Sequence, residues 1–334
     1  MKFNFFYRLF QLSILVVSGA FPIANDSLYA HYVLVGPVPV TTVREIVSFP
    51  ATTNLIPGSI TLGGERDIYV SFPDLNAVRR YSLKGEFLKS YDLPVSYENI
   101  TSGIAVKWNQ DVFVVVNSYF ACHHHANGVW KISHEDGSIS KFACLPEGCY
   151  PSNLVFDKSD HLYLTDSVRG EIYKIDREGH VRSWFRNDVL KGSSKGYILS
   201  GVPQGVCAIT MGKKSKHLFV ANKDFGRIFR IEIKQNGCAG KCKEIANSTC
   251  LEGVTELSLN RRGILYAIIP NMNAIVGITD KGIELIYAGS PLESPTGLIM
   301  KKHKGVNCGF ISNSSPENPG LLRIKVACDP LHAD

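Results

Sequence analysis

Two groups of polar residues in this chain have side chains that could bind a ligand or a metal ion. The first is the run Cys122-His123-His124-His125. Neutral imidazoles bind zinc and other transition metals, so His123 and His125 could lend nitrogens to one ion. The second group is spread along the chain and offers hydroxyl, amide and carboxylate groups for hydrogen bonds to a polar ligand; its members are Ser102, Ser152, Asn153, Gln204, Glu252 and Thr296.

The residues of the second group lie within a sequence unit that recurs six times. Each copy has a small turn residue before an apolar run, a polar turn, an aromatic-led apolar run that ends in Asn or Asp, and further strand-like segments. The turn residues, spaced by 44 to 52 positions, are Gly58, Gly103, Asn153, Gly205, Gly253 and Gly297. A period of about 40 to 50 residues with four strands per unit is typical of a propeller blade. The sequence therefore predicts an all-β fold, a six-bladed β-propeller with four-stranded antiparallel blades.

The repeats predict a single propeller domain over residues 31–334. The last unit ends after its third strand, near residues 321–326, while an unassigned strand-like segment, residues 42–48, precedes the first unit. We expect this N-terminal segment to complete the sixth blade, because the ring would then have no open edge. The composition, 45% apolar and 20% charged, excludes a disordered, collagen-like or multi-spanning membrane chain.

Several runs in the repeats resemble a known group of propellers. They are the LYLTD, LFVAN and IYVSF runs, the GRIFRI segment and the DREG turn. These runs resemble the six-bladed propellers of the NHL-repeat and senescence marker protein/gluconolactonase-like group, which also includes strictosidine-synthase-like proteins. The resemblance covers residues 42–326 and implies the fold. Such propellers include lactonases, lyases and binding proteins, so the fold alone does not select a function.

The resemblance also implies a place for a site. Because successive strands are antiparallel, the loops that enter the innermost strands share one face of the ring, here called the start face. In gluconolactonase-like hydrolases, residues on this face supply a Glu, Asn residues and an Asp to one divalent cation, which polarises a lactone carbonyl and activates water. This chain departs from that pattern, because Glu252 is the one carboxylate of the group.

Three hypotheses for the function remain open. The first is a protein that binds a small molecule or a protein partner at the mouth of the central channel, with no identified catalytic residue. The second is a metal-dependent lactonase in which Glu252, with His123 and His125, holds one divalent cation, Ca or Zn. The third is binding to an anionic surface or an acidic partner through the opposite face, here called the turn face, whose basic residues are Lys213, Lys214, Lys216, Arg261, Arg262, Lys301, Lys302 and Lys304. We expect no nucleic-acid partner, since no aromatic platform interleaves these lysines.

The N-terminus has the pattern of a secretory signal peptide. Lys2 and Arg8 precede an apolar run, and small residues suit cleavage after Ala20 or Ala30. We therefore expect residues 1–30 to be removed and the protein to be secreted or periplasmic. No other segment has the roughly 20 apolar residues that a membrane span needs. We expect a monomer.

The nine cysteines are consistent with an oxidising compartment. Strand direction places Cys308 and Cys328 at one end of neighbouring strands, and Cys238 and Cys242 at a short hairpin, so these are the expected disulfide pairs. A pairing among Cys122, Cys144 and Cys149 is also open. Cys207 is expected to remain a buried thiol.

Overall fold

A computed structural model describes residues 40–53, 55–64, 67–97, 99–118, 127–193, 202–260, 263–303 and 306–326. The predicted signal peptide, residues 1–30, lies outside these ranges. Within them, no helix is long and apolar enough to cross a membrane. The helical residues form short 3-10 turns, namely η1 (Ala51–Thr53), η2 (Pro73–Leu75), η4 (Asp188–Leu190), η5 (Lys213–Ser215), η6 (Thr249–Leu251) and η7 (Pro270–Met272).

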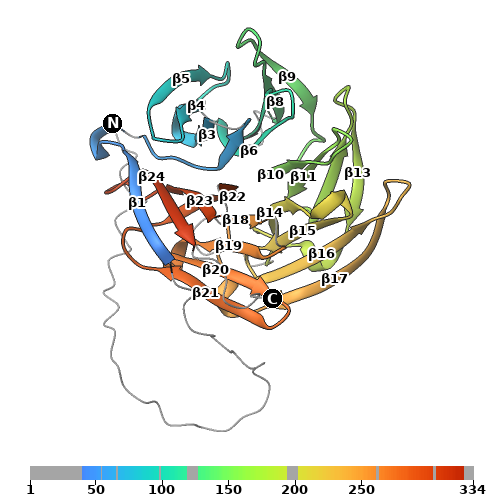
Figure 1. The fold of residues 1–334 in the computed structure, drawn as a ribbon. Helices are drawn as coiled ribbons and strands as arrows, with labels where there is room; N and C mark the ends of the chain where they lie inside the picture. The colour runs from blue at the N-terminus through green and yellow to red at the C-terminus, as the bar shows by residue number, and fades with distance from the viewer. Residues whose placement is uncertain are drawn as a thin grey trace, which may run out of the picture. The chain divides into compact units, whose positions relative to one another are not determined.

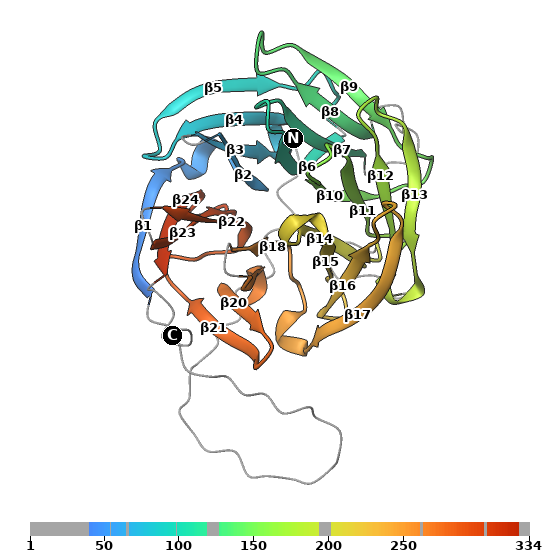
Figure 2. The same cartoon turned by 45° about the vertical axis from the view of Figure 1, so that its right-hand side comes forward.

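Six four-stranded antiparallel sheets form the described fold. Figures 1 and 2 show them around a common centre, with one strand of each sheet nearest to it. These innermost strands are β2 (Ile60–Gly63), β6 (Asn99–Val106), β10 (Pro151–Phe156), β14 (Val206–Met211), β18 (Glu256–Leu259) and β22 (Pro295–His303). The second strands are β3 (Asp67–Phe72), β7 (Val112–Ser118), β11 (Leu162–Asp166), β15 (His217–Asn222), β19 (Leu265–Ile269) and β23 (Val306–Asn313).

The outer half of each sheet completes the blade. The third strands are β4 (Ala77–Ser82), β8 (Gly128–Ile132), β12 (Glu171–Ile175), β16 (Arg227–Ile233), β20 (Ala274–Thr279) and β24 (Gly320–Val326). The outermost strands are β5 (Phe87–Asp92), β9 (Ile139–Cys144), β13 (Val181–Arg186), β17 (Ala239–Asn247), β21 (Gly282–Ala288) and β1 (Val40–Ser48). We number the blades 1 to 6 in the order of their innermost strands. The predicted six-bladed, all-β fold with four-stranded antiparallel blades is confirmed.

Blade 6 combines strands from the two ends of the described chain. Its order is β1-β24-β23-β22, and β1 runs antiparallel to β24 with Thr42 opposite Lys325 and Ser48 opposite Gly320. The outer edge of β24 is therefore paired with β1, which removes the free backbone donors and acceptors of an open edge.

The apolar core lies between the faces of neighbouring blades. One buried cluster joins Tyr69 and Val78 of blade 1 to Val114 and Ile132 of blade 2, and each of the other clusters likewise spans more than one blade. A sheet that packs on both faces buries both sets of alternating side chains. This explains why all five residues of β11, the LYLTD run, are buried.

Hydroxyl groups on second strands join three pairs of neighbouring blades. The Oγ of Ser71 in β3 donates to the carbonyl of Ser102, at 3.0 Å, and the Oγ1 of Thr165 in β11 donates to the carbonyl of Cys207, at 2.9 Å. Ser312 in β23 donates to the carbonyl of Gly58, which joins blade 6 to blade 1. Because each acceptor lies in the first half of an innermost strand or just before it, these inter-blade hydrogen bonds fix the position of those strands along the central axis.

The described cysteines are free thiols: Cys144, Cys149, Cys207, Cys238, Cys242, Cys250 and Cys308. The expected Cys238–Cys242 disulfide is therefore wrong for this structure. Cys242 lies within β17, and four residues of extended chain span roughly 13 Å, beyond the roughly 7 Å that a disulfide allows between Cα atoms. Cys144 and Cys149 are not bonded to each other, and Cys122 and Cys328 lie outside the described residues. Cys207 is buried, as expected.

Removing one inter-blade hydrogen bond should destabilise the fold. Thr165→Val keeps the shape of a side chain that is 0% exposed, but it leaves the Cys207 carbonyl and the Asn153 amide without their hydroxyl partner. We expect the free energy of unfolding to fall by about 1 to 3 kcal/mol in urea denaturation. Thr279→Val, whose hydroxyl bonds only within its own turn, is the control and should change it by less than about 0.5 kcal/mol. Equal effects of the two variants would contradict the role given to Thr165.

Candidate functional site

The strand pairing places one residue of each blade at the same height along the central axis of the ring, which we call its level. These residues directly precede the ladder pairs Ile60–Val70, Ile104–Val114, Leu154–Leu164, Ile209–Val220, Leu257–Ala267 and Leu298–Ile311. They are Ser59, Gly103, Asn153, Ala208, Glu256 and Gly297. Three of the six carry polar side chains, and these three belong to alternate blades.

The three polar side chains meet at Glu256. Asn153 donates from Nδ2 to Oε1 of Glu256 at 2.9 Å, and Ser59 donates from Oγ to Oε2 at 3.2 Å. The Asn153 side chain is held in turn, because its Oδ1 accepts the amide of Leu154 at 2.8 Å. We call Ser59, Asn153 and Glu256 the axial cluster. It joins blades 1, 3 and 5 across the centre of the ring.

Glycine at position 103 makes room for this cluster. A Cβ atom there would lie 2.6 Å from the Cα of Asn153 and 2.7 Å from its Oδ1. Both distances are shorter than a side chain can tolerate, so a larger residue in blade 2 would displace Asn153. The close approach of blades 2 and 3 therefore depends on a residue without a side chain.

Burial controls the electrostatics of the axial cluster. Glu256 is 7% exposed, and the loss of solvation raises the pKa of its carboxyl to about 8, although the hydrogen bonds from Asn153 and Ser59 lower it. The carboxyl is therefore mainly protonated at pH 7. A protonated carboxyl can donate as well as accept a hydrogen bond, and a group that titrates near neutral pH can transfer protons.

The axial cluster does not fit the divalent cation that a gluconolactonase-like site implies. Hard cations such as Ca²⁺ take six to eight oxygen ligands, commonly including several carboxylates. The cluster offers one carboxyl, one hydroxyl and an amide whose oxygen already accepts the Leu154 amide. Two hydrogen-bond donors already occupy the carboxyl. We therefore derive no chemistry through a metal ion at this place.

The structure places the predicted site residues in different surroundings. Asn153 belongs to the axial cluster, whereas Gln204 accepts Lys223 Nζ at 2.6 Å through its Oε1. Thr296 donates to the carbonyl of Gly58 at 3.3 Å, so its hydroxyl joins blades 6 and 1. Ser152 is half-buried, and the Oγ of Ser102 is buried without a hydrogen-bond partner in the described part of the chain.

Glu252 is not part of the axial cluster. Glu252 is exposed, and it follows the 3-10 turn η6 rather than beginning β18. The next residue, Gly253, has φ +86° and belongs to the same turn, three residues before Glu256. In the sequence, the apolar residue Val254 after Gly253 resembles the start of an innermost strand. The pattern therefore predicts Glu252, rather than Glu256, as the carboxylate near the axis. His123 and His125 lie outside the described residues.

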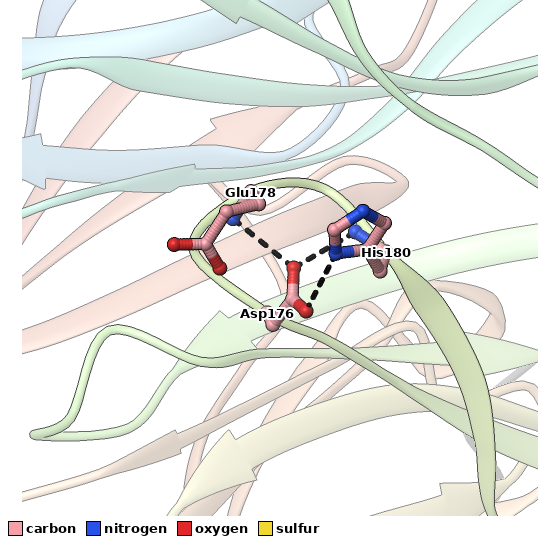
Figure 3. A group of neighbouring side chains, drawn as sticks. All are labelled: Asp176, Glu178 and His180. Atoms are coloured by element: carbon pink, nitrogen blue, oxygen red, sulfur yellow. Dashed lines mark hydrogen bonds and ion pairs between the residues drawn. The ribbon is translucent and has the colours of Figure 1, made fainter.

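A second group of metal-type side chains lies in the turn between β12 and β13. The ligand atoms of Asp176, Glu178 and His180 lie within 4.8 Å of one another, and Figure 3 shows Asp176 between the other two. Asp176 accepts the amides of Glu178 at 3.0 Å and His180 at 2.8 Å, and its Oδ2 contacts His180 Nδ1 at 2.9 Å. Asp157 makes the same contacts with His161 in another turn of blade 3. The arrangement is therefore explained by the hydrogen bonds that stabilise such a turn.

Part of the predicted basic face is described. Lys213 and Lys214 lie in η5 and Lys216 follows it, and all three are exposed. Lys301 is half-buried in β22, which also contains Lys302. Arg261, Arg262 and Lys304 lie outside the described residues.

The six sheets define a six-bladed propeller, and solved structures of similar fold are known. A virginiamycin B lyase from Staphylococcus aureus matches with a TM-score of 0.58 and 16% identity, over 84% of this chain and 98% of the lyase. A gluconolactonase from Xanthomonas campestris matches with a TM-score of 0.61 and 12% identity, over 85% and 89% of the two chains. An auxiliary nutrient binding protein from Bacteroides thetaiotaomicron matches with a TM-score of 0.60 and 10% identity, over 81% and 69%.

These likenesses show the fold that the sequence resemblance predicted. No protein-family model matches the sequence, and no curated protein matches it. The similar structures include two kinds of enzyme and a binding protein, and at these identities they share the fold alone with this chain.

Replacing Glu256 by Gln should change how stability depends on pH. An unperturbed glutamate ionises near pH 4.5, whereas Glu256 in the folded protein ionises near pH 8. Between these values the unfolded chain binds fewer protons, so the wild type loses about 1.4 kcal/mol of stability per pH unit through this group. Glu256→Gln keeps the hydrogen bonds and cannot ionise. We expect the variant to match the wild type near pH 4 and to be more stable by pH 8.

Urea denaturation across this pH range measures the difference. Glu252→Gln removes an exposed carboxylate from the same face and is the matched control. We expect the control to follow the wild type at every pH. A constant offset between Glu256→Gln and the wild type would show that the carboxyl does not titrate as described.

Proposed function

We propose that this protein is an exported propeller that binds a small polar ligand at the axial mouth on the start face, with Glu256 as the central hydrogen-bonding group. The buried carboxyl of Glu256 carries the proposal. Burying a carboxyl group costs free energy, and an apolar side chain would fill the axis without that cost. Groups held at a perturbed pKa in a fold of this kind are candidates for binding or catalysis.

The surroundings of Glu256 support a polar ligand. A protonated carboxyl, the amide of Asn153 and the hydroxyl of Ser59 together offer both donors and acceptors. One level nearer the start face, the Oγ of Ser102 has no hydrogen-bond partner among the described residues. Sugars and sugar acids present hydroxyl and carbonyl groups that such a set can recognise.

A lactonase-type hydrolase is the second candidate. The structural likeness to a gluconolactonase and the ionisation of Glu256 near neutral pH favour it. It would need its cation held by residues other than the axial cluster. The resemblance therefore supports an enzyme less strongly than it supports the fold.

Thermal shift with defined compounds tests the binding proposal. We would use glucono-1,5-lactone, gluconate and glucose as probes with the wild type, Glu256→Gln and Glu252→Gln. A bound ligand at about one hundred times its Kd adds about 2.7 kcal/mol and should raise Tm by about 5 °C. We expect a shift for at least one compound, retained in Glu252→Gln and at least halved in Glu256→Gln. An equal shift in all three proteins would place binding away from the axis.

Metal analysis separates the two candidates. We expect purified protein, dialysed against buffer without chelator, to hold less than one equivalent of calcium or zinc, because the axial cluster offers too few oxygen ligands. Elemental analysis of the wild type and Glu256→Gln measures this. One equivalent of either ion in the wild type, lost in Glu256→Gln together with hydrolysis of glucono-1,5-lactone, would favour the hydrolase instead.

A further inference from the structure

We propose that a cleft on the turn face, between blades 3 and 4, binds a compact polyanion that carries phosphate or sulfate groups. The two blades are neighbours in the ring (Figure 2). The cleft has a volume of about 730 Å³ and is lined by the β10–β11 turn, the β14–β15 turn, the β16–β17 turn and parts of β12 and β13. This volume is within the range of sites for small molecules. The axial cluster lies at the opposite end of the strands, so this inference is independent of the proposed function.

The charge of the cleft is strongly positive. Two carboxylates line it, those of Asp157 and Glu232. Six cations line it, namely Lys158, Lys174, Arg182, Lys214, Lys216 and Lys234. Converging charges of one sign in a recessed surface attract counter-ions more strongly than the same charges spread over a convex face.

Lys174 is the central observation. Lys174 is 4% exposed, yet its ammonium group has no ion pair and no hydrogen-bond acceptor among the described residues. Burial lowers the pKa of Lys174, and the charge of Asp157 raises it without forming an ion pair. It lies 5.2 Å from the centre of the Tyr163 ring, a weaker partner than an anion. Buried lysines are rare unless they are paired. A largely buried lysine that lines a cleft without an ion-pair partner indicates a site for an anion.

Two other blades pair a cation at this position with an aspartate. Lys174 stands opposite Tyr163, as Lys131 stands opposite Phe113 in blade 2. Lys131 pairs with Asp111 at 2.8 Å, and Asp111 lies two residues before Phe113. The residue two before Tyr163 in blade 3 is His161.

Blade 1 has the same ion pair as blade 2. There Arg80 stands opposite Tyr69, and its Nε donates to Asp67 at 2.8 Å. In blade 3 a histidine, which cannot carry a negative charge, stands in the place of this carboxylate. Blade 4 has the same combination in Arg230 and His217, but Arg230 is exposed whereas Lys174 is buried. The chain itself thus provides two internal comparisons in which the same cation is neutralised.

The two carboxylates in the cleft do not replace the missing partner. Asp157 already accepts the amides of Ser159 at 2.8 Å and His161 at 2.9 Å and contacts the His161 ring at 3.1 Å. Glu232 is exposed and accepts the amide of Lys241 at 3.3 Å. In the described residues, neither forms an ion pair with a lysine or arginine of the cleft.

Hydrogen bonds hold the walls of the cleft in place. The amide of Lys158 in blade 3 donates to Ser215 Oγ in blade 4 at 3.1 Å, which joins two of the turns. Trp184 Nε1 donates to the carbonyl of Gly237 at 2.9 Å. Gly237 has φ +78°, and a Cβ atom there would lie 3.2 Å from Lys174 Nζ, so glycine allows this turn to pass close to the ammonium group.

These features select the chemistry of the ligand. Lysine ammonium groups bind phosphate and sulfate as point charges, and several of them around one recess suit a group with multiple negative charges. The lining residues include no Phe, Tyr or Trp ring that could stack on a nucleobase or a sugar ring, and their aromatic rings are the smaller imidazoles of His161 and His217. A small polyphosphate or sulfated ligand is therefore favoured over a nucleic acid.

Isothermal titration calorimetry with pyrophosphate and myo-inositol hexakisphosphate tests the proposal. The variant is Lys174→Met, which keeps the apolar stem against Tyr163 and removes the charge. Lys213→Met is the matched control, since Lys213 is an exposed lysine of the same face outside the cleft. We expect the wild type to bind at least one probe, Lys174→Met to bind it at least tenfold more weakly, and Lys213→Met to stay within twofold. Raised salt should weaken binding.

Stability and vesicle measurements complete the test. Because Lys174 has no anion partner in the described structure, Lys174→Met should not lower Tm, so weaker binding would not reflect unfolding. Vesicles of phosphatidylcholine and phosphatidylglycerol in equal parts distinguish a soluble ligand from a lipid headgroup, and we expect no cosedimentation. Lack of binding to both probes, equal weakening in both variants, or vesicle binding that Lys174→Met leaves unchanged would each overturn the proposal.

Discussion

The inter-blade hydrogen bonds near the start of the innermost strands set the geometry on which the axial cluster depends. Each blade packs on its neighbours through apolar side chains, and such contacts alone would let one sheet slide along another. The hydroxyl groups of Ser71, Thr165 and Ser312 prevent this, because each donates to one particular carbonyl of the next blade. Since the donors are buried, a shift of one residue would leave polar groups unpaired. Ser71 and Thr165 also accept the amides of Ser59 and Asn153, so the level of these two residues around the axis follows from this constraint.

The axial cluster shows how a ring of repeats produces a site that no single repeat contains. Its three residues occupy the same position in blades 1, 3 and 5, and each is polar where the corresponding residues of the other blades are Gly or Ala. Small residues in the alternate blades leave space in a narrow axis, and the polar residues fill it. The carboxyl of Glu256 is held neutral by burial, so the axis contains a hydrogen-bonding group without a buried charge.

The sequence predicted the blades well and the site residues only in part. The blade period survives because turn residues and aromatic-led strands such as the LYLTD run recur with every blade. The level of each innermost strand is a finer property, since Gly253 and Val254 imitate the start of a strand while the ladder begins at Glu256. Asn153 was found because its turn and its strand coincide. Ser59 and Glu256 were missed because their level depends on pairing with β3 and β19, which a turn pattern does not specify.

The unpaired Lys174 was hidden from sequence reasoning for a related reason. Taken alone, a lysine in a strand is usually a solvated residue, and the turn lysines beside it read as a general basic face. Only the strand register shows that Lys174 is equivalent to Lys131 and Arg80, and that His161 occupies the place of their aspartate partners. A repeat protein holds several copies of each position, and here blades 1 and 2 pair the cation with an aspartate, blade 4 leaves Arg230 exposed, and blade 3 buries Lys174 at the wall of a cleft. Divergence among blades therefore identifies the parts of this ring whose chemistry is not explained by the fold.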